Sequence, residues 1–301
     1  MVTEYDMDST WSTLVTDFIK EQLSTYSASP DSILGNISTL PVAYGKRTTQ
    51  RTIQDPDTIV HVSREFQPHR APKVTEPQNL DLANLSDSFV VPRADFAADP
   101  EGVRIHVRDT GANFRNGIEK LMVEGSTVNV VTRGIADVPG VTLGTINRPE
   151  LQAIATTGDW STTANKRADL VNAMAALIAK RFYGPYLILA PSIAKPMMSE
   201  VIANTAQPIG TWIKSTVGVN IAYSPFVDED ATKEVFDVYV IDTSKIHLGI
   251  SSVMMDAYYV SKDHAYYWDW EVYCVPMFDP LYDGTEYLKG VASILALDWE
   301  D

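Results

Sequence analysis

The chain has 301 residues, 45% of them hydrophobic, so it is long enough to bury a substantial core as one large domain or two intertwined ones. Its formal net charge of −15 and its pI near 4.7 argue against a nucleic-acid-binding surface, which depends on Lys and Arg. The single cysteine, Cys274, excludes an intrachain disulfide framework. No apolar run reaches the roughly 18 to 20 residues of a membrane span, and no secretion leader is recognisable. We therefore expect an intracellular protein that enters no membrane.

The first expected elements are a short helix and an extended arm. Residues 9–23 place apolar side chains, among them Trp11 and Phe18, on one helical stripe. This spacing predicts an amphipathic helix that packs on the body, with docking of a partner or a cargo through Trp11 and Phe18 as the alternative. Residues 25–42 then combine Pro, Ser, Gly and Asn without a helical period, which predicts an extended arm.

A long polar β-hairpin is expected next. Residues 42–70 are rich in strand-forming residues around an Asp-Pro-Asp turn at 55–57. The hairpin carries four arginines, Arg47, Arg51, Arg64 and Arg70. Because acidic residues alternate with them, we interpret them as ion-pair donors to neighbouring subunits and not as contacts to nucleic acid. An isolated two-stranded ribbon is marginal in water, so the hairpin is either mobile or supported by a neighbouring subunit.

The strongest helix signal follows Asp99 and Pro100, a capping residue and a proline at the first helical position. Apolar residues then recur every three or four positions until Gly125, which supplies the stop. At 1.5 Å per residue, roughly 24 residues make a helix about 36 Å long. A helix of this length can serve as a spine for the molecule.

The middle of the chain alternates helices and strands. We expect a strand at 126–133, followed by a loop with a short helix at 149–155. A helix at 162–182 is expected to bury four apolar residues. Gly184-Pro185 ends this helix and turns the chain into the apolar strand 186–190. The four are Leu170, Met174, Leu177 and Ile178. The elements expected after them are helices near 193–204 and 208–216 and strands at 219–226, 235–241 and 245–251.

The aromatic tail is expected to form strands. In residues 265–276, Trp268, Trp270, Val272 and Cys274 alternate with tyrosines and carboxylates, which predicts a half-buried strand. We interpret the aromatic residues of 258–270 as core and subunit interface, with stacking on nucleic-acid bases as the alternative. A final strand is expected at 286–297.

No signature of enzymatic chemistry is present. The sequence contains no P-loop, dinucleotide-binding fingerprint, GxSxG elbow or HExxH helix, and its five histidines lack metal-ligand spacing. We interpret the acidic residues 228–230 and Glu234 as a solvated loop, with a cation site as the alternative. No catalytic residue, cofactor or metal ligand is therefore assigned.

The order of these parts resembles the tailed-phage capsid fold, the Hong Kong 97-like fold that encapsulin nanocompartments share. The resemblance covers residues 45–298. The stretch GVRIHVRDTGANFRNGIEKLMVEG is similar to the spine helix of encapsulins, and RADLVNAMAALIAKRFYGPYLILAPS is similar to their second-domain helix, Gly-Pro-Tyr turn and central strand. Further similar stretches are PIGTWIKSTVGVNIAYSPF, VYVIDTSKIHLGIS and EYLKGVASIL.

The resemblance implies an α+β fold with four parts. These are an N-terminal arm with the amphipathic helix at 1–42, an extended E-loop hairpin at 43–77, a P-domain with the long spine helix at 78–135 and 255–301, and an A-domain of mixed sheet and helices at 136–254. Under this division the hairpin arginines lie in or next to the E-loop, and Trp11 and Phe18 lie in the arm.

The resemblance also implies a function in assembly. The chain would be the major capsid protein of a tailed double-stranded DNA virus, and many copies, as hexamers and pentamers, would build an icosahedral shell in the host cytoplasm. Portal and other virion proteins would be its partners, and the enclosed DNA would be held without sequence-specific binding. The alternative is an encapsulin shell around a cargo enzyme. Neither is an enzyme, whereas a third interpretation is a soluble α/β enzyme with an unrecognised carboxylate site.

Overall fold

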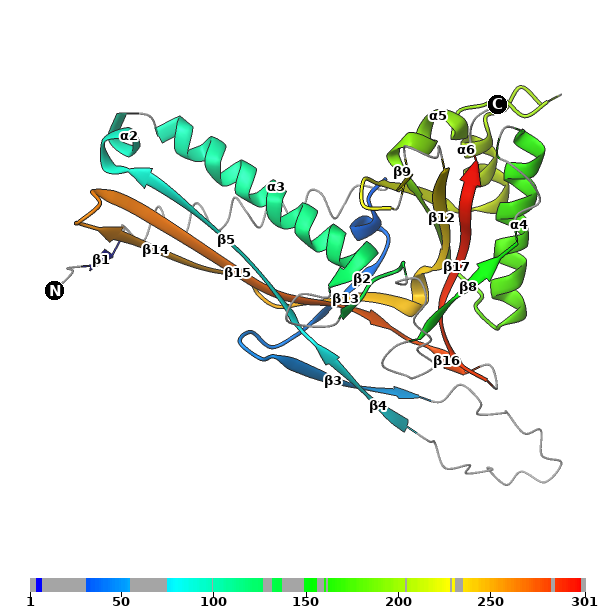
Figure 1. The fold of residues 1–301 in the computed structure, drawn as a ribbon, viewed down its shortest axis with the longest axis horizontal. Coiled ribbons are helices and arrows are strands. Elements are labelled where there is room, and N and C mark those ends of the chain that lie inside the picture. The colour runs from blue at the N-terminus through cyan, green and yellow to red at the C-terminus, as the bar shows by residue number, and fades with distance from the viewer. Residues whose placement is uncertain are drawn as a thin grey trace.

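The fold is known from a computed structural model. It describes residues 4–6, 31–54, 75–98, 100–126, 132–136, 149–155, 160, 162–203, 205–227, 229–230, 235–282 and 285–298. The molecule is elongated, with a long helix and long strands in one part and a more compact mixed sheet with helices in the other (Figure 1). A thin hairpin projects from the body between them.

The elongated part is built on a six-stranded sheet with the order β1-β14-β15-β13-β2, in which β5 also pairs with β15. Its strands are β1 (Glu4–Asp6), β2 (Ser38–Pro41), β5 (Ala83–Pro92), β13 (Ile246–Ile250), β14 (Met254–Val260) and β15 (Ala265–Phe278). The same segment of β15 pairs with both β5 and β14, so these two strands lie on opposite edges of it.

The predicted spine helix is confirmed as α3 (Pro100–Glu124), which follows the short helix α2 (Arg93–Ala98). Gly125 adopts φ +77°, a conformation that suits glycine and ends the helix. Phe114 of α3 packs against the buried face of β15, where Trp268 and Trp270 are fully buried. The predicted alternation of β15 is thus confirmed, because its inner face forms the core with the spine helix.

Cys274 lies on the same inner face of β15 and is fully buried. Burial raises the pKa of its thiol to about 12, since the thiolate would lose its hydration. We expect no reaction with a thiol reagent such as DTNB in the native protein at about pH 8, and one reactive thiol per chain after denaturation. Rapid native labelling would contradict this burial.

The compact part contains a seven-stranded sheet with the order β10-β9-β12-β17-β16, to which β11 adds through β12 and β8 through β17. Its strands are β8 (Glu150–Ile154), β9 (Tyr186–Pro191), β10 (Asn220–Ser224), β11 (Glu229–Asp230), β12 (Val235–Asp242), β16 (Leu281–Tyr282) and β17 (Tyr287–Asp298). The predicted apolar strand is β9, whose central residues Leu187–Ala190 are fully buried. Strands on both sides and packing on both faces explain its continuous apolar run.

Helix α4 (Thr163–Ala179) covers this sheet, and Thr162 caps it by accepting a hydrogen bond from the Asn165 backbone N–H at 3.3 Å. The chain then turns into β9 with Gly184 at φ +82°. Asp242 of β12 accepts a hydrogen bond from the Gly184 N–H at 3.0 Å, which fixes this turn against the sheet. The predicted helix–turn–strand sequence is therefore confirmed, although the helix is shorter than expected.

Two helix predictions need correction. Residues 150–154 form strand β8 and no helix, because they pair in parallel with β17, a partner far away in sequence. The helix expected near 193–204 is shorter and consists of a 3₁₀ turn η2 (Ser192–Ala194) and α5 (Lys195–Met198), whereas the helix expected near 208–216 is confirmed as α6 (Ile209–Trp212), which continues into the π turn η3 (Ile213–Val217). The helix expected at 9–23 lies outside the described residues. The single strand expected at 126–133 is wrong, because its two ends form separate strands, β6 (Gly125–Ser126) and β7 (Thr132–Arg133), which pair antiparallel with each other.

The strands of the two main sheets are not divided at residue 255, where the sequence placed the boundary between the A-domain and the second part of the P-domain. Strand β13 precedes that boundary but pairs with β15, whereas β17 follows it but pairs with β12 and β8. Each of the two main sheets therefore combines strands from both sides of that boundary. No helix in the described part of the chain is long and apolar enough to cross a bilayer.

Candidate assembly surfaces

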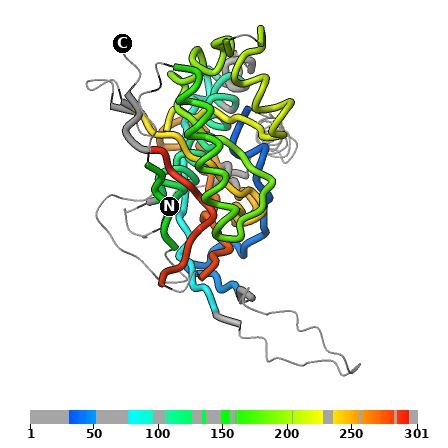
Figure 2. Tube along the Cα trace, turned by 90° about the vertical axis from the view of Figure 1, so that its right-hand side faces the viewer, coloured from blue at the N-terminus to red at the C-terminus, as the bar shows by residue number. Residues whose placement is uncertain are grey.

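The predicted hairpin is present as an antiparallel ribbon of β3 (Thr48–Gln54) and β4 (Thr75–Asp81). Its second strand, β4, begins later in the sequence than expected. Arg51 lies opposite Gln78 in this ribbon. Its tip, residues 55–74, lies outside the described residues. The ribbon projects away from both sheets in two perpendicular views (Figures 1 and 2).

The root of the hairpin is attached to the body by apolar packing. Leu80 and Leu82 are buried against Val275 and Met277 of β15. At the same level the Leu82 N–H donates a hydrogen bond to the Arg47 carbonyl oxygen at 2.9 Å. Strand β4 continues through Leu82 directly into β5, so the ribbon is an extension of an edge strand of the body.

Farther along the ribbon, an ionic cluster forms a second attachment. The Nη1 atom of Arg51 lies 2.6 Å from Oδ1 of Asp279, and its Nη2 donates to Oδ2 at 3.2 Å. His247 of β13 shares a hydrogen bond with Ser38 of β2 through Nδ1, and its Nε2 lies 3.3 Å from Oδ2 of Asp279. We call Arg51, Asp279 and His247 the clamp, because they join the hairpin to two body strands.

Asp279 is ionised in this setting. Burial by itself would raise the pKa of this carboxyl, but the hydrogen bond to His247 and the charges of Arg51 and Lys245 oppose it, and the net result is a lowered pKa. A carboxyl whose pKa is lower in the folded state stabilises the fold above its unfolded pKa and loses this effect as the pH falls through the folded value.

The pH dependence of stability tests this assignment. We expect Asp279→Asn to lower the free energy of unfolding by a constant amount above about pH 4, the ordinary pKa of an aspartate, and by progressively less at lower pH. Urea denaturation of both proteins across this range gives the measurement. A difference that grows as the pH falls would contradict a lowered pKa at Asp279.

The residues predicted as contact sites have different environments in the structure. Arg51 pairs within its own chain, and Arg47 is exposed. Arg64, Arg70, Trp11 and Phe18 lie outside the described residues. The sequence did not identify Asp279 or His247 as partners of the hairpin. No local signal could have done so, because pairing of β13 with β2 and β15 brings them there.

The outer face of the six-stranded sheet is acidic and rich in tyrosine. Tyr258 and Tyr267 stack with ring centroids 5.5 Å apart, and the Tyr258 hydroxyl donates to Asp269 at 3.0 Å. The Tyr44 hydroxyl donates to Glu271 at 2.9 Å. The outward-facing described positions of β5, β14 and β15 include carboxylates but no Lys or Arg. The tryptophans of the aromatic tail thus lie in the core with Tyr259 and Tyr266, whereas Tyr258, Tyr267 and Tyr273 face outward.

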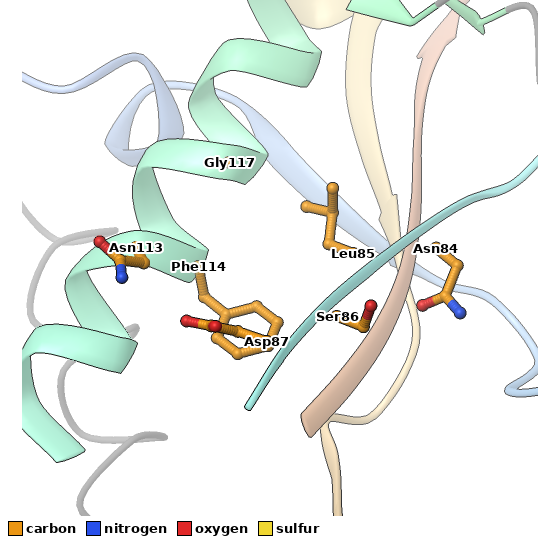
Figure 3. Close-up of a pocket in the computed structure, with 7 residues that line it drawn as sticks. All are labelled: Asn84, Leu85, Ser86, Asp87, Asn113, Phe114 and Gly117. Carbon is orange, nitrogen blue, oxygen red and sulfur yellow. The ribbon is translucent and has the colours of Figure 1, made fainter. Parts of the chain in front are cut away.

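A hollow of about 280 Å³ lies between β5 and α3 (Figure 3). Asp87 is its only charged lining residue, beside Asn84, Ser86, Asn113 and Phe114. A single carboxylate without a neighbouring base does not form an acid–base pair. In the described ranges, no group of three or more His, Cys, Asp or Glu side chains is arranged to hold a metal ion.

Helix α4 lies at the end of the molecule that faces the viewer in Figure 2. It exposes an apolar stripe. Val171, Ala175 and Ile178 are exposed at the spacing i, i+4 and i+7, with Val171 45% and Ile178 49% accessible, and Tyr183 beyond the helix is 72% accessible. The expected burial of Ile178 is therefore wrong, because the helix rests on the sheet through Leu170, Ala173 and Leu177 instead. A helix that is apolar on both faces is typical of a protein contact surface.

Solved structures share this architecture. No protein-family model matches the sequence, and no curated protein matches it. A virus-like particle from Pyrococcus furiosus is similar with a TM-score of 0.62 and 10% identity, over 92% of this chain and 97% of that one. The capsid of Myoviridae phage XM1 is similar with a TM-score of 0.56 and 12% identity, over 89% and 92% of the two chains. The capsid of an empty GTA particle, computed with C5 symmetry, gives 0.60 and 10%, over 89% and 90%.

These similarities extend over nearly the whole length of both chains at identities too low to indicate more than architecture. They agree with the long spine helix on a strand sheet, the second mixed sheet and the projecting hairpin (Figure 1). The chain therefore has the fold of these phage-capsid and virus-like-particle structures.

Proposed function

We propose that this chain is the major capsid protein of a tailed double-stranded DNA virus, which self-assembles into an icosahedral shell around the genome. The observation that carries the proposal is the ribbon β3–β4, which projects from a body with a capsid fold. A free two-stranded ribbon is marginally stable, so contact with a second copy explains why the chain retains it. Closed symmetry lets one such contact repeat around the shell.

The contacts between copies use distinct surfaces in this proposal. The E-loop, with Arg47, Arg64 and Arg70, reaches the neighbouring copy, and the outer sheet face with Asp256, Asp269 and Glu271 is its charge-complementary landing surface. The helices beside the second sheet meet at the rotational axes, as hexamers and pentamers. The portal and other virion proteins complete the particle, and the acidic chain encloses DNA without binding its sequence.

The alternative is an encapsulin shell that encloses a cargo enzyme. The similarity to the Pyrococcus furiosus virus-like particle, which spans 97% of that chain, supports this alternative. In that case the segment with Trp11 and Phe18, expected from the sequence to be helical, forms part of a cargo-docking surface. In both proposals the chain acts by assembly and has no catalytic role.

The contents of purified particles separate the two functions. The full chain is expressed together with its neighbouring genes, and shells are isolated by density centrifugation after nuclease treatment. Nuclease-protected double-stranded DNA supports the viral capsid, whereas a stoichiometric protein guest and no DNA supports the nanocompartment. A small soluble oligomer without shells contradicts both.

The apolar stripe of α4 gives a prediction about the contacts between copies. We expect Val171→Asp to lower the yield of closed shells at least about tenfold, which corresponds to about 1.4 kcal/mol. The reason is that a carboxylate would be buried in an apolar contact. Electron microscopy and size-exclusion chromatography measure the yield. The adjacent Asn172→Asp adds the same charge outside the stripe and is expected to assemble normally; equal effects of the two changes would contradict the assignment.

A further inference from the structure

The hairpin is held to the body at two levels. The first is the apolar root, where Leu82 donates to Arg47, and the second is the clamp at Arg51. Arg51 follows Arg47 by four residues in an extended strand, so the two levels are about 13 Å apart along the ribbon. A ribbon attached at one level can pivot about it, whereas attachment at two separated levels fixes its direction.

The geometry of the clamp suits this directional role. The Nη1 atom of Arg51 lies beside Oδ1 of Asp279, and its Nη2 atom donates to Oδ2. Two such contacts constrain the orientation of the guanidinium group as well as its distance from the carboxylate. The Asp279 side chain is only 25% exposed, and His247 and Ser38 hold it from the body side. The aspartate is therefore a fixed point on the body, and Arg51 is the movable partner on the ribbon.

The attachment of the outer part of β3 to the body is ionic. The ion pair joins Arg51 of β3 to Asp279, which follows β15, and Gln78 of β4, opposite Arg51 in the ribbon, is fully buried. The Ser38–His247 contact lies on paired strands and thus forms independently of the hairpin. Loss of the Arg51–Asp279 contact would leave the root intact and remove the ionic attachment of β3, which is the contact that constrains the orientation of the ribbon.

We infer that the clamp of Arg51, Asp279 and His247 is the positioning element that sets the direction in which the hairpin leaves the body and thereby selects a single shell size. The first half concerns the chain itself. The second half rests on the proposed shell function, since the hairpin's direction determines the angle at which it meets a neighbouring copy. Arg51 is thus a positioning residue within the subunit, and the remaining hairpin arginines stay available for contacts between subunits.

Two spin labels measure the direction of the ribbon. Gln50→Cys on β3 and Ser86→Cys on β5 place labels at exposed positions, and the buried Cys274 stays unlabelled. Distances are measured by pulsed electron paramagnetic resonance in shells diluted with unlabelled chains, or in the soluble chain if no shells form. We expect Arg51→Gln and Asp279→Asn each to broaden the distance distribution at least about twofold. The double variant is expected to match the single ones, because both changes remove one contact.

Shell size is the second measurement, made by electron microscopy on the same variants. We expect the unmodified chain to give one shell diameter, and the clamp variants to give several diameters or open sheets. Lys214→Gln is the matched control, because it breaks an exposed ion pair with Asp31 at 3.7 Å far from the hairpin. It is expected to change neither measurement.

The outcomes separate the inference from the proposed function. An unchanged distance distribution in both clamp variants overturns the positioning role, whether or not shells form. A broadened distribution with shells of one unchanged size overturns the selection of shell size. If the unmodified chain forms no shells, the proposed function fails, and the distance measurement still decides whether the clamp directs the ribbon.

Discussion

Removal of the outer hairpin is expected to abolish closed shells while leaving the subunit folded. Arg51 and Gln78 face each other across the ribbon, so residues 52–77 can be replaced by Asn-Gly, a two-residue turn that closes antiparallel strands. This change keeps the root and the clamp. Shell yield is expected to fall at least about a hundredfold, the factor that a loss of about 2.7 kcal/mol implies. Negative-stain electron microscopy measures the yield.

The control is the folded state of the shortened chain. Its two main sheets do not include the replaced residues, so its circular dichroism and its urea midpoint are expected to stay close to those of the full chain. Unfolding of the shortened chain would show that the outer hairpin is needed for the stability of its own subunit. A normal yield of shells from a folded, shortened chain would contradict the role given to the hairpin.

Gly134→Ala is expected to have the largest effect on stability. A Cβ atom at this position would lie 2.2 Å from the Val123 carbonyl oxygen and 2.4 Å from the Gly125 nitrogen, and backbone atoms cannot move aside as flexible side chains can. The same turn carries hydrogen bonds from Ile135 to Met122 and from Lys289 to the Gly134 carbonyl. We expect the free energy of unfolding to fall by at least about 3 kcal/mol in urea denaturation.

Gly117→Ala is the matched control for this prediction. Gly117 lies within α3, and a Cβ atom there would meet only Leu85 Cδ1 at an ordinary 3.5 Å. Because glycine weakens a helix interior by up to about 1 kcal/mol relative to alanine, this change is expected to be neutral or stabilising. An equal change in the free energy of unfolding for the two variants would contradict the close contact of Gly134 with the Val123 carbonyl at the end of the spine helix.

The sequence predicted the elements whose periodicity reflects their own burial. The spine helix, the apolar strand β9 and the alternating strand β15 belong to this group, because each packs apolar side chains into the core. Strand β8 was predicted as a helix, since its strand character depends on β17, more than a hundred residues later. Strand β5 was not predicted because Asp87 interrupts its apolar inner face and Val90 is exposed on its outer face, which breaks the alternation typical of a strand.

The assembly surfaces were predictable only in part. The hairpin follows from its polar strands, and Arg51 was identified on it, but its partner Asp279 could not be. That contact depends on where the end of β15 and the root of the hairpin lie in space. The exposed stripe of α4 was missed because a helix with two apolar faces gives no periodicity that distinguishes the buried one. In both cases the missing information is tertiary packing.

The state of the purified full chain tests the central claim most directly. Cryo-electron microscopy of the protein at assembly concentrations measures whether the chain forms closed shells and what each ribbon contacts. The account predicts hollow icosahedral particles in which the ribbon β3–β4 of each copy lies against a neighbouring copy. A monodisperse monomer, with the whole ribbon ordered against its own body, would contradict it.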